Sequence, residues 1–166
     1  MSITQNRLNL GCGVYRREGW TNIDLDVAMK PDLQINFKRI AQHFSPLSCS
    51  HISIIHSIAY LREWEVLQLL RDARVLLQDG GEIEIEFPDV VKCAKRIVDD
   101  PSFENVRPLY GFDALDGGEY GTYKFAWSES SMSASLIGAG FRTVSAGTPI
   151  YHGPQPERDS RVTAKR

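Results

Sequence analysis

The sequence lacks a cysteine framework, a long apolar run and an excess of charge of one sign. Its three cysteines (Cys12, Cys49 and Cys93) are widely spaced without a Cys-x-x-Cys pair, and its four histidines show no ligand spacing. These absences argue against disulfides and metal sites, and they predict a reducing compartment, the cytoplasm. No segment approaches the roughly 18 apolar residues of a membrane span, and residues 1–7 lack a signal-peptide core. The net charge of −2 indicates no general affinity for nucleic acid.

The sequence does contain strand-like segments that alternate with helix-like ones. The length of 166 residues and the apolar content of 42% suit a single domain over residues 1–166. Strands are predicted at residues 7–10, 20–25, 33–37, 51–58, 82–87, 141–145 and 160–164. Helices are predicted at residues 61–77, 90–98 and 128–137, with Gly80 and Gly81 ending the first. This alternation predicts an α/β fold with a mostly parallel sheet.

The connections between the first three predicted strands are short. Residues 14–20 and 26–32 are gaps of seven residues each, whereas a parallel crossover normally takes about a dozen. We therefore expect helices to be reduced or missing there, which leaves one face of the sheet thinly covered. Residues 82–87 alternate strictly and place three glutamates on one face, which we expect to face water. The alternative is that these glutamates rim a cationic partner or substrate. A homodimer or a protein partner could also cover the open face.

The most informative segment is the glycine loop at residues 8–13, which is followed by Asp24 at the end of the next predicted strand. Glycines after a strand let the backbone approach a ligand closely, and an acid at the next strand's end can accept both hydroxyl protons of a ribose. The simpler alternative is a pair of turn glycines with a surface aspartate. The third glycine of a dinucleotide fingerprint and the Gly-Lys-Ser/Thr of a P-loop are both absent. The pattern thus favours a cofactor with a ribose but without phosphate.

Together with several later segments, this loop resembles the class I S-adenosylmethionine-dependent methyltransferases. The resemblance is strongest to a short bacterial subgroup often associated with polysaccharide and sugar biosynthesis. The matching segments are residues 8–13, TNIDLD at 21–26, HSIAYL at 56–61, LLQDGGEIEIEFPD at 76–89, GAGF at 138–141 and RDSRVTAK at 158–165. The resemblance implies a Rossmann-like methyltransferase fold with a mostly parallel seven-stranded sheet, and S-adenosylmethionine as the cofactor.

The resemblance also implies which residues bind the cofactor. Gly11 and Gly13 would line its methionine part, and Asp24 would hold the ribose hydroxyls. Asn36 would lie near the adenine, while His56 and Ser57 would lie close to the sulfonium. The full set of expected cofactor-binding residues is Asn9, Gly11, Cys12, Gly13, Asp24, Asn36, His56 and Ser57.

This sequence departs from the subgroup at several positions. Ala59 and Tyr60 stand where the subgroup often has glutamate and histidine, and Ser50 stands where an aspartate is common. Tyr123 and Lys124 occupy the place of a His-Lys pair. These losses bear on catalysis more than on fold or cofactor binding.

Three residues are candidates for the catalytic chemistry. His56 is the first candidate for a general base, because histidine titrates near neutrality; the alternative is a core or cofactor-contacting histidine. Asp89 is the second, and its alternative role is a helix N-cap. Tyr123 belongs to an aromatic segment that suits a sugar acceptor and could form a lid; the alternative is packing over the sheet. The aromatic segment comprises Tyr110, Tyr120, Tyr123, Lys124 and Trp127.

Two functions of different kinds follow from these observations. The first is methyl transfer to an oxygen of a small molecule or a glycan. The second is a degenerate methyltransferase-fold protein that acts as a non-catalytic binding or partner subunit. An RNA methyltransferase is disfavoured, because the sequence shows no basic stripe and no additional binding domain.

Overall fold

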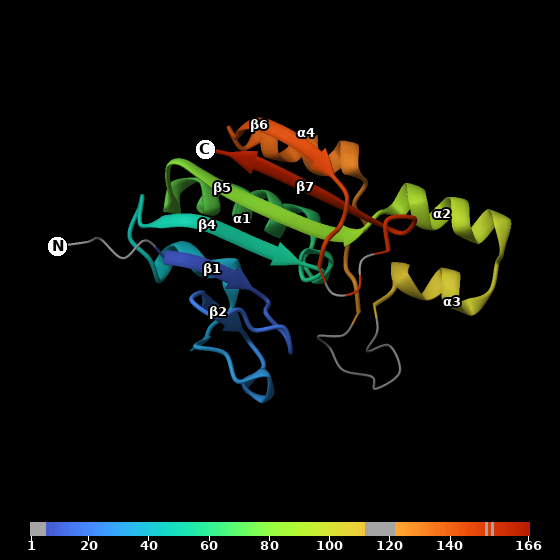
Figure 1. The fold of residues 1–166 in the computed structure, drawn as a ribbon, viewed down its shortest axis with the longest axis horizontal. Coiled ribbons are helices and arrows are strands. Elements are labelled where there is room, and N and C mark those ends of the chain that lie inside the picture. The colour runs from blue at the N-terminus through green and yellow to red at the C-terminus, as the bar shows by residue number, and fades with distance from the viewer. Residues whose placement is uncertain (1–5, 112–121, 152, 154) are drawn as a thin grey trace.

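The computed structural model describes residues 6–111, 122–151, 153 and 155–166. Seven strands form one sheet in the order β3-β2-β1-β4-β5-β7-β6 (Figure 1). The strands are β1 (Asn6–Leu10), β2 (Thr21–Asp24), β3 (Leu33–Gln34), β4 (Cys49–Ile55), β5 (Leu77–Pro88), β6 (Arg142–Gly147) and β7 (Asp159–Lys165). The first five strands run parallel to one another, and β7 runs antiparallel to both β5 and β6. The predicted mostly parallel seven-stranded α/β sheet is therefore confirmed.

In the described ranges, four α-helices and four short 3-10 helices connect the strands. They are α1 (Glu63–Leu76), α2 (Val90–Asp99), α3 (Phe103–Val106), α4 (Glu129–Gly138), η1 (Val27–Met29), η2 (Phe37–Gln42), η3 (Ile58–Tyr60) and η4 (Arg107–Leu109). Residues 11–20 form turns with no helix, and η1 is the one helical turn between β2 and β3. None of the helices formed by the described residues is both long and apolar enough to cross a membrane.

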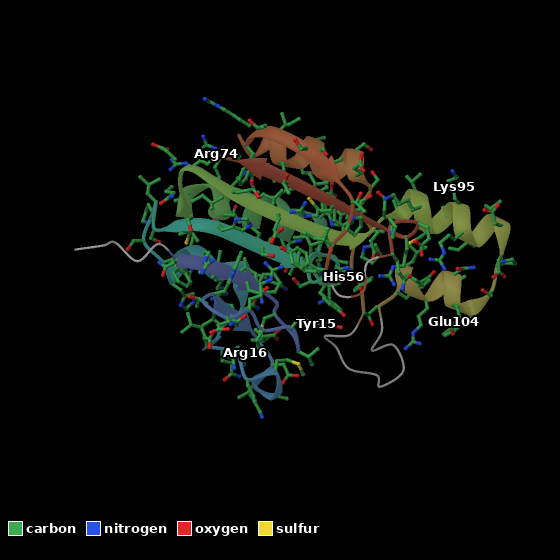
Figure 2. All side chains as sticks on the ribbon, viewed as in Figure 1. Tyr15, Arg16, His56, Arg74, Lys95 and Glu104 are labelled. Atoms are coloured by element: carbon green, nitrogen blue, oxygen red, sulfur yellow. The ribbon has the colours of Figure 1, made fainter. Side chains whose placement is uncertain are left out.

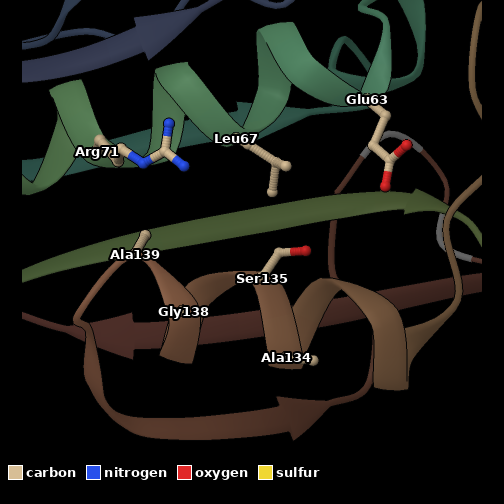
Figure 3. A pocket seen from close by; sticks show the side chains of 7 residues that line it. All are labelled: Glu63, Leu67, Arg71, Ala134, Ser135, Gly138 and Ala139. Carbon is tan, nitrogen blue, oxygen red and sulfur yellow. The ribbon is translucent and has the colours of Figure 1, made fainter.

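The helices α1 and α4 pack on one face of the sheet, behind it in Figure 1. The apolar side of β5, which comprises Ile83, Ile85 and Phe87, is fully buried beneath them. Between the two helices runs a groove of about 380 Å³, which is lined by Leu67 and Arg71 of α1 and by Ser135 of α4 (Figure 3). The helices α2 and α3 extend past the carboxyl ends of β4 and β5. These helices therefore lie next to that end of the sheet.

Two predicted boundaries were wrong, for local reasons. The third strand ends at Gln34 because Asn36 begins η2 as its N-cap, where its side chain accepts the N–H of Lys38 at 3.1 Å. The glycine pair Gly80-Gly81 does not end α1, which already ends at Leu76. The pair lies inside β5, in an irregular stretch where the β4 partner changes from Leu77 to Glu82. Gly80 has a φ of +73°, which suits glycine at such a bulge.

The expectation that the β5 glutamates face water was wrong for two of the three. Glu84 and Glu86 are 2% and 0% exposed. Glu84 accepts hydrogen bonds from the guanidinium of Arg17 at 2.9 Å, from that of Arg161 at 3.0 Å and from the hydroxyl of Tyr151 at 3.0 Å. The short segment after the glycine loop thus folds over the sheet face that the helices leave open, and this polar network buries the carboxylate.

Glu86 is buried by the segment that precedes β7. Its carboxylate accepts the backbone N–H groups of Ile150 at 2.7 Å and Tyr151 at 3.2 Å. Burial raises the pKa of Glu86 above its usual value, and these two hydrogen bonds offset only part of that effect. The two glutamates therefore attach two separate loops to the same strand.

We expect Glu84→Gln to destabilise the protein by about 3 kcal/mol near neutral pH, because the change leaves two guanidiniums without their buried carboxylate. Burial alone would raise the pKa of Glu84, but the nearby His51 ring and the hydrogen bonds from Arg17 and Arg161 outweigh it and hold the pKa well below the usual range. The ionised form is therefore favoured in the folded state. Its stabilisation is present above about pH 4.5 and is lost as the pH falls through the lower folded value.

Urea unfolding at a series of pH values measures this effect. The Glu84→Gln variant should show both the loss near neutrality and a shallower decline of stability in acid. Glu82→Gln, on the same strand face but partly exposed, is the matched control and should change the free energy of unfolding by less than about 0.5 kcal/mol. Equal losses in the two variants would show that the network contributes nothing specific.

Candidate cofactor and acceptor site

The glycine loop and Asp24 are joined directly at the carboxyl ends of β1 and β2. These strands pair in parallel with Leu10 opposite Ile23, so the segments that follow them emerge side by side. The backbone N–H of Gly13 donates to Oδ2 of Asp24 at 2.8 Å, and the N–H of Asp26 donates to Oδ1 at 3.0 Å. The carboxylate is therefore held in place beside the loop.

Gly11 is packed against the segment that follows β4. Its φ is +66°, and a Cβ built on it would lie 2.4 Å from Cβ of Ser57 and 3.2 Å from the ring of Phe37. The Ser57 hydroxyl in turn donates to the carbonyl of Leu10 at 2.8 Å. Gly13 is different, because its φ is +50° but nothing lies within 4 Å of the corresponding Cβ position. The loop thus has one glycine for internal packing and one that faces open space.

Phe37 is a residue of this site that the sequence analysis missed. Phe37 follows Asn36 at the end of the third predicted strand. Its apolar side chain, directly after a residue expected near the adenine, was the sequence signal that could have placed it in the site. Asn36 itself is exposed and lines a groove of about 430 Å³ together with Lys38 and Trp64. Trp64 is 64% exposed. It lies two residues from the buried Val66 and hence on the opposite side of α1.

Residues 14–20 form no helix, and hydrogen bonds from asparagine side chains fix their position instead. The amide of Asn9 donates to the carbonyl of Tyr15 and to Oδ1 of Asn22, both at 3.0 Å. Oδ1 of Asn22 also accepts the N–H of Arg17 at 2.7 Å, and its amide donates back to the carbonyl of Arg17 at 3.0 Å. Asn9 is buried, so it supports the loop from beneath.

Cys12 is buried between the two glycines. Burial, reinforced by the negative charge of Asp24, raises the pKa of its thiol to about 11. The thiol therefore stays protonated near neutrality and packs as a small apolar side chain. Among the described residues, no group of three or more His, Cys, Asp or Glu side chains gathers as metal ligands would.

His56 directly follows β4 and lies at the carboxyl ends of the central strands (Figure 2). Its φ is +57°, its side chain is 18% exposed, and its Nε2 lies 3.7 Å from Oδ2 of Asp159. Burial lowers the pKa of His56 below its ordinary value, although the charge of Asp159 partly offsets this while Arg158 adds to it. The imidazole is therefore neutral near pH 7, as a general base requires.

Tyr123 packs against Tyr60, with ring centroids 4.9 Å apart in a T-shaped arrangement. Burial raises the pKa of the Tyr123 hydroxyl well above its usual value, so the phenol stays protonated and serves as a donor rather than a base. The next residue, Lys124, donates its N–H to the carbonyl of Ala59 at 2.8 Å. This segment therefore lies against η3, close behind His56 in the chain.

The remaining aromatic residues of the segment divide between core and surface. Trp127 is buried and belongs to the hydrophobic core, whereas Tyr110 is exposed. Tyr120 lies outside the described residues. Trp127 therefore packs as a structural residue, whereas Tyr60 and Tyr123 form an aromatic pair whose first member lies four residues after His56 in the chain.

Asp89 is buried and accepts four hydrogen bonds. Oδ1 accepts the N–H groups of Val91 at 2.8 Å and Lys92 at 3.3 Å, which makes Asp89 the N-cap of α2. Oδ2 accepts the N–H of Glu129 at 2.8 Å and the hydroxyl of Ser160 at 2.9 Å. With its acceptor sites occupied in this way, Asp89 has the geometry of a residue that joins α2, α4 and β7.

Several solved structures with the same fold are described as S-adenosylmethionine-dependent methyltransferases. One from Archaeoglobus fulgidus matches with a TM-score of 0.67 and 15% identity over 98% of this chain and 86% of that one. The chain has the methyltransferase fold. One from Methanosarcina mazei matches with a TM-score of 0.67 and 12% identity over 100% of this chain and 94% of the other. One from Mesorhizobium loti gives 0.64 and 16% identity over 100% and 94%. No protein-family model and no curated protein sequence matches the chain.

Proposed function

We propose that this protein is an S-adenosylmethionine-dependent methyltransferase that transfers a methyl group to an oxygen of a small molecule or glycan. The observation that carries the proposal is the hydrogen bond between the Gly13 N–H and Asp24. It joins a glycine loop to an acid at the carboxyl edge of a methyltransferase-fold sheet, where ligands of open α/β sheets bind. The short bacterial subgroup that the sequence resembles supports a sugar-containing acceptor.

The residues at this edge fit the cofactor. Gly13 leaves open space beside the loop, and the carboxylate of Asp24 can accept the protons of two ribose hydroxyls. The site requires no phosphate-binding helix, in agreement with the turns at residues 11–20. When bound, S-adenosylmethionine supplies a methyl group activated by the positive sulfur. Gly11, Gly13, Asp24 and Ser57 are the residues that would hold it.

The chain's own residues would then position the acceptor and move one proton. The bound cofactor would supply the methyl group and keep the electron pair of its carbon–sulfur bond, and the residues around His56 would hold the acceptor oxygen beside it. Neutral His56 takes the hydroxyl proton and passes it to solvent. Tyr60 and Tyr123 offer aromatic faces of the kind that sugars stack on, and the protonated Tyr123 hydroxyl adds a donor. Positioning of the two reactants supplies much of the remaining rate enhancement.

Turnover of labelled S-adenosylmethionine, with sugars and nucleotide sugars as acceptors, tests this function. We expect the rate to fall in acid as His56 becomes protonated, with a midpoint below about pH 6.5, because the pKa of His56 lies below its ordinary value. His56→Asn should lower the rate by about 100-fold or more and remove this acid limb. The exposed His43→Asn serves as the control and should leave the profile unchanged.

A well-folded protein that binds neither S-adenosylmethionine nor its demethylated product would contradict the proposal. That result would favour the alternative, a methyltransferase-fold subunit without catalysis, and would direct attention to the polar face of the sheet around Glu84.

A further inference from the structure

The antiparallel direction of β7 brings a second acid to His56. Asp159 is the first residue of β7 and pairs with Pro88, the last residue of β5. His56 follows β4, and its backbone N–H donates to the carbonyl of Glu86 at 2.8 Å. The start of an antiparallel strand therefore meets the ends of two parallel ones, and Oδ2 of Asp159 lies 3.7 Å from Nε2 of His56.

Asp159 is held rigidly in this position. Its side chain is 1% exposed, and both of its oxygens accept hydrogen bonds of 2.6 Å from the guanidinium of Arg158. Lys92 also donates to the backbone carbonyl of Asp159 at 2.6 Å. A bidentate ion pair between adjacent residues in a buried setting allows little movement. The carboxylate beside the imidazole is therefore a fixed charge that the neighbouring cation only partly neutralises.

His56 carries backbone strain at the same place. A φ of +57° is uncommon for a residue with a side chain, and such strain persists where the surroundings over-determine it. The hydrogen bond from the His56 N–H to the carbonyl of Glu86 holds this backbone conformation beside the end of β5. The second observation on which the inference rests is therefore that a residue with a strained backbone carries the ring that lies 3.7 Å from a buried acid.

We propose that Asp159 is a positioning residue for His56: with Arg158 it fixes the orientation of the imidazole and sets its affinity for a proton. The inference rests on the proposed function and deepens it by assigning a partner to the base. Once the ring has taken the acceptor's proton, the carboxylate faces a positive imidazolium and stabilises it. The neighbouring Tyr123 stays a neutral phenol, and within the part of the chain that the structure describes Asp159 and Arg158 are the charged groups whose effect on the ring is resolved.

The inference predicts opposite shifts from two neighbouring substitutions. Asp159→Asn removes the negative charge beside His56 and leaves the positive charge of Arg158 in place. The proton affinity of His56 should therefore fall by about threefold or more. Arg158→Gln removes the positive charge and should raise the proton affinity by a similar factor. The adjacent Glu157→Gln is the matched control and should leave it unchanged, because Glu157 is exposed and pairs with Arg96.

Nuclear magnetic resonance of the histidine side chains measures these shifts on the full chain without any acceptor. His56→Asn assigns the His56 signal, and a pH titration then gives its midpoint in each variant. Opposite shifts support the pairing, and identical midpoints in wild type, Asp159→Asn and Arg158→Gln would overturn it. If Asp159→Asn does not fold, the upward shift in Arg158→Gln decides the question alone.

Ligand binding separates this inference from the proposed function. S-adenosylhomocysteine should bind wild type and Asp159→Asn with affinities within about twofold of each other, because Asp159 acts on the base and not on the cofactor loop. Where an acceptor is available, Asp159→Asn should lower kcat with little effect on KM. Failure of wild type to bind the ligand would end the methyltransferase proposal, while the titrations would still report on the His56–Asp159 pair.

Discussion

Asp24→Ala is expected to weaken the binding of S-adenosylhomocysteine by about 100-fold or more, which corresponds to roughly 3 kcal/mol. The carboxylate has two roles in the proposed complex. It would accept hydrogen bonds from the ribose hydroxyls. It already accepts hydrogen bonds from the N–H groups of Gly13 and Asp26, which hold the loop beside it. The substitution removes the charged acceptor and also releases the loop, so both effects act in the same direction. Titration calorimetry of the purified protein measures the change.

Asp26→Ala is the matched control for this experiment. Asp26 lies two residues further along, is exposed, and caps η1 by accepting the N–H of Ala28 at 2.8 Å. Loss of that cap should cost about 1 kcal/mol of local stability and change ligand affinity by less than about twofold. Equal weakening in the two variants would mean that Asp24 acts only through general loop stability.

The two glycines of the loop should respond differently to alanine. Gly11→Ala should destabilise the protein by about 3 kcal/mol or more, because the new Cβ meets Ser57 at 2.4 Å and the positive φ adds strain. Gly13→Ala should cost about 1 kcal/mol of stability, since strain is the only penalty where the space is open. The same Cβ would enter the volume we assign to the cofactor, so Gly13→Ala should lose most of its affinity for S-adenosylhomocysteine.

Thermal unfolding and calorimetry on the two variants separate these effects. Gly11→Ala should show the larger drop in Tm. Gly13→Ala should show a small drop in Tm together with a large loss of affinity for S-adenosylhomocysteine. A Gly13→Ala variant that binds with wild-type affinity would place the cofactor elsewhere, because its Cβ would then project into space that no ligand uses.

The sequence by itself determined the features that depend on residues close together in the chain or on adjacent strands. A glycine loop after an apolar strand predicts a close backbone approach, and an acid at the end of the next strand lies beside it once the two strands pair in parallel. The alternation in residues 82–87 likewise predicts that Ile83, Ile85 and Phe87 share one buried side. These features follow from backbone geometry and from a side-chain period of two, both of which act over a few residues.

Only the tertiary structure decided what covers each surface and which distant side chains meet. The alternation of residues 82–87 places Glu84 on a side of the sheet, but its burial depends on Arg17, Arg161 and Tyr151 arriving from distant segments. The pairing of His56 with Asp159 likewise depends on the antiparallel direction of β7, which nothing local to either residue encodes. A local pattern reports which way a side chain points, whereas burial and electrostatic partners depend on how the whole chain packs.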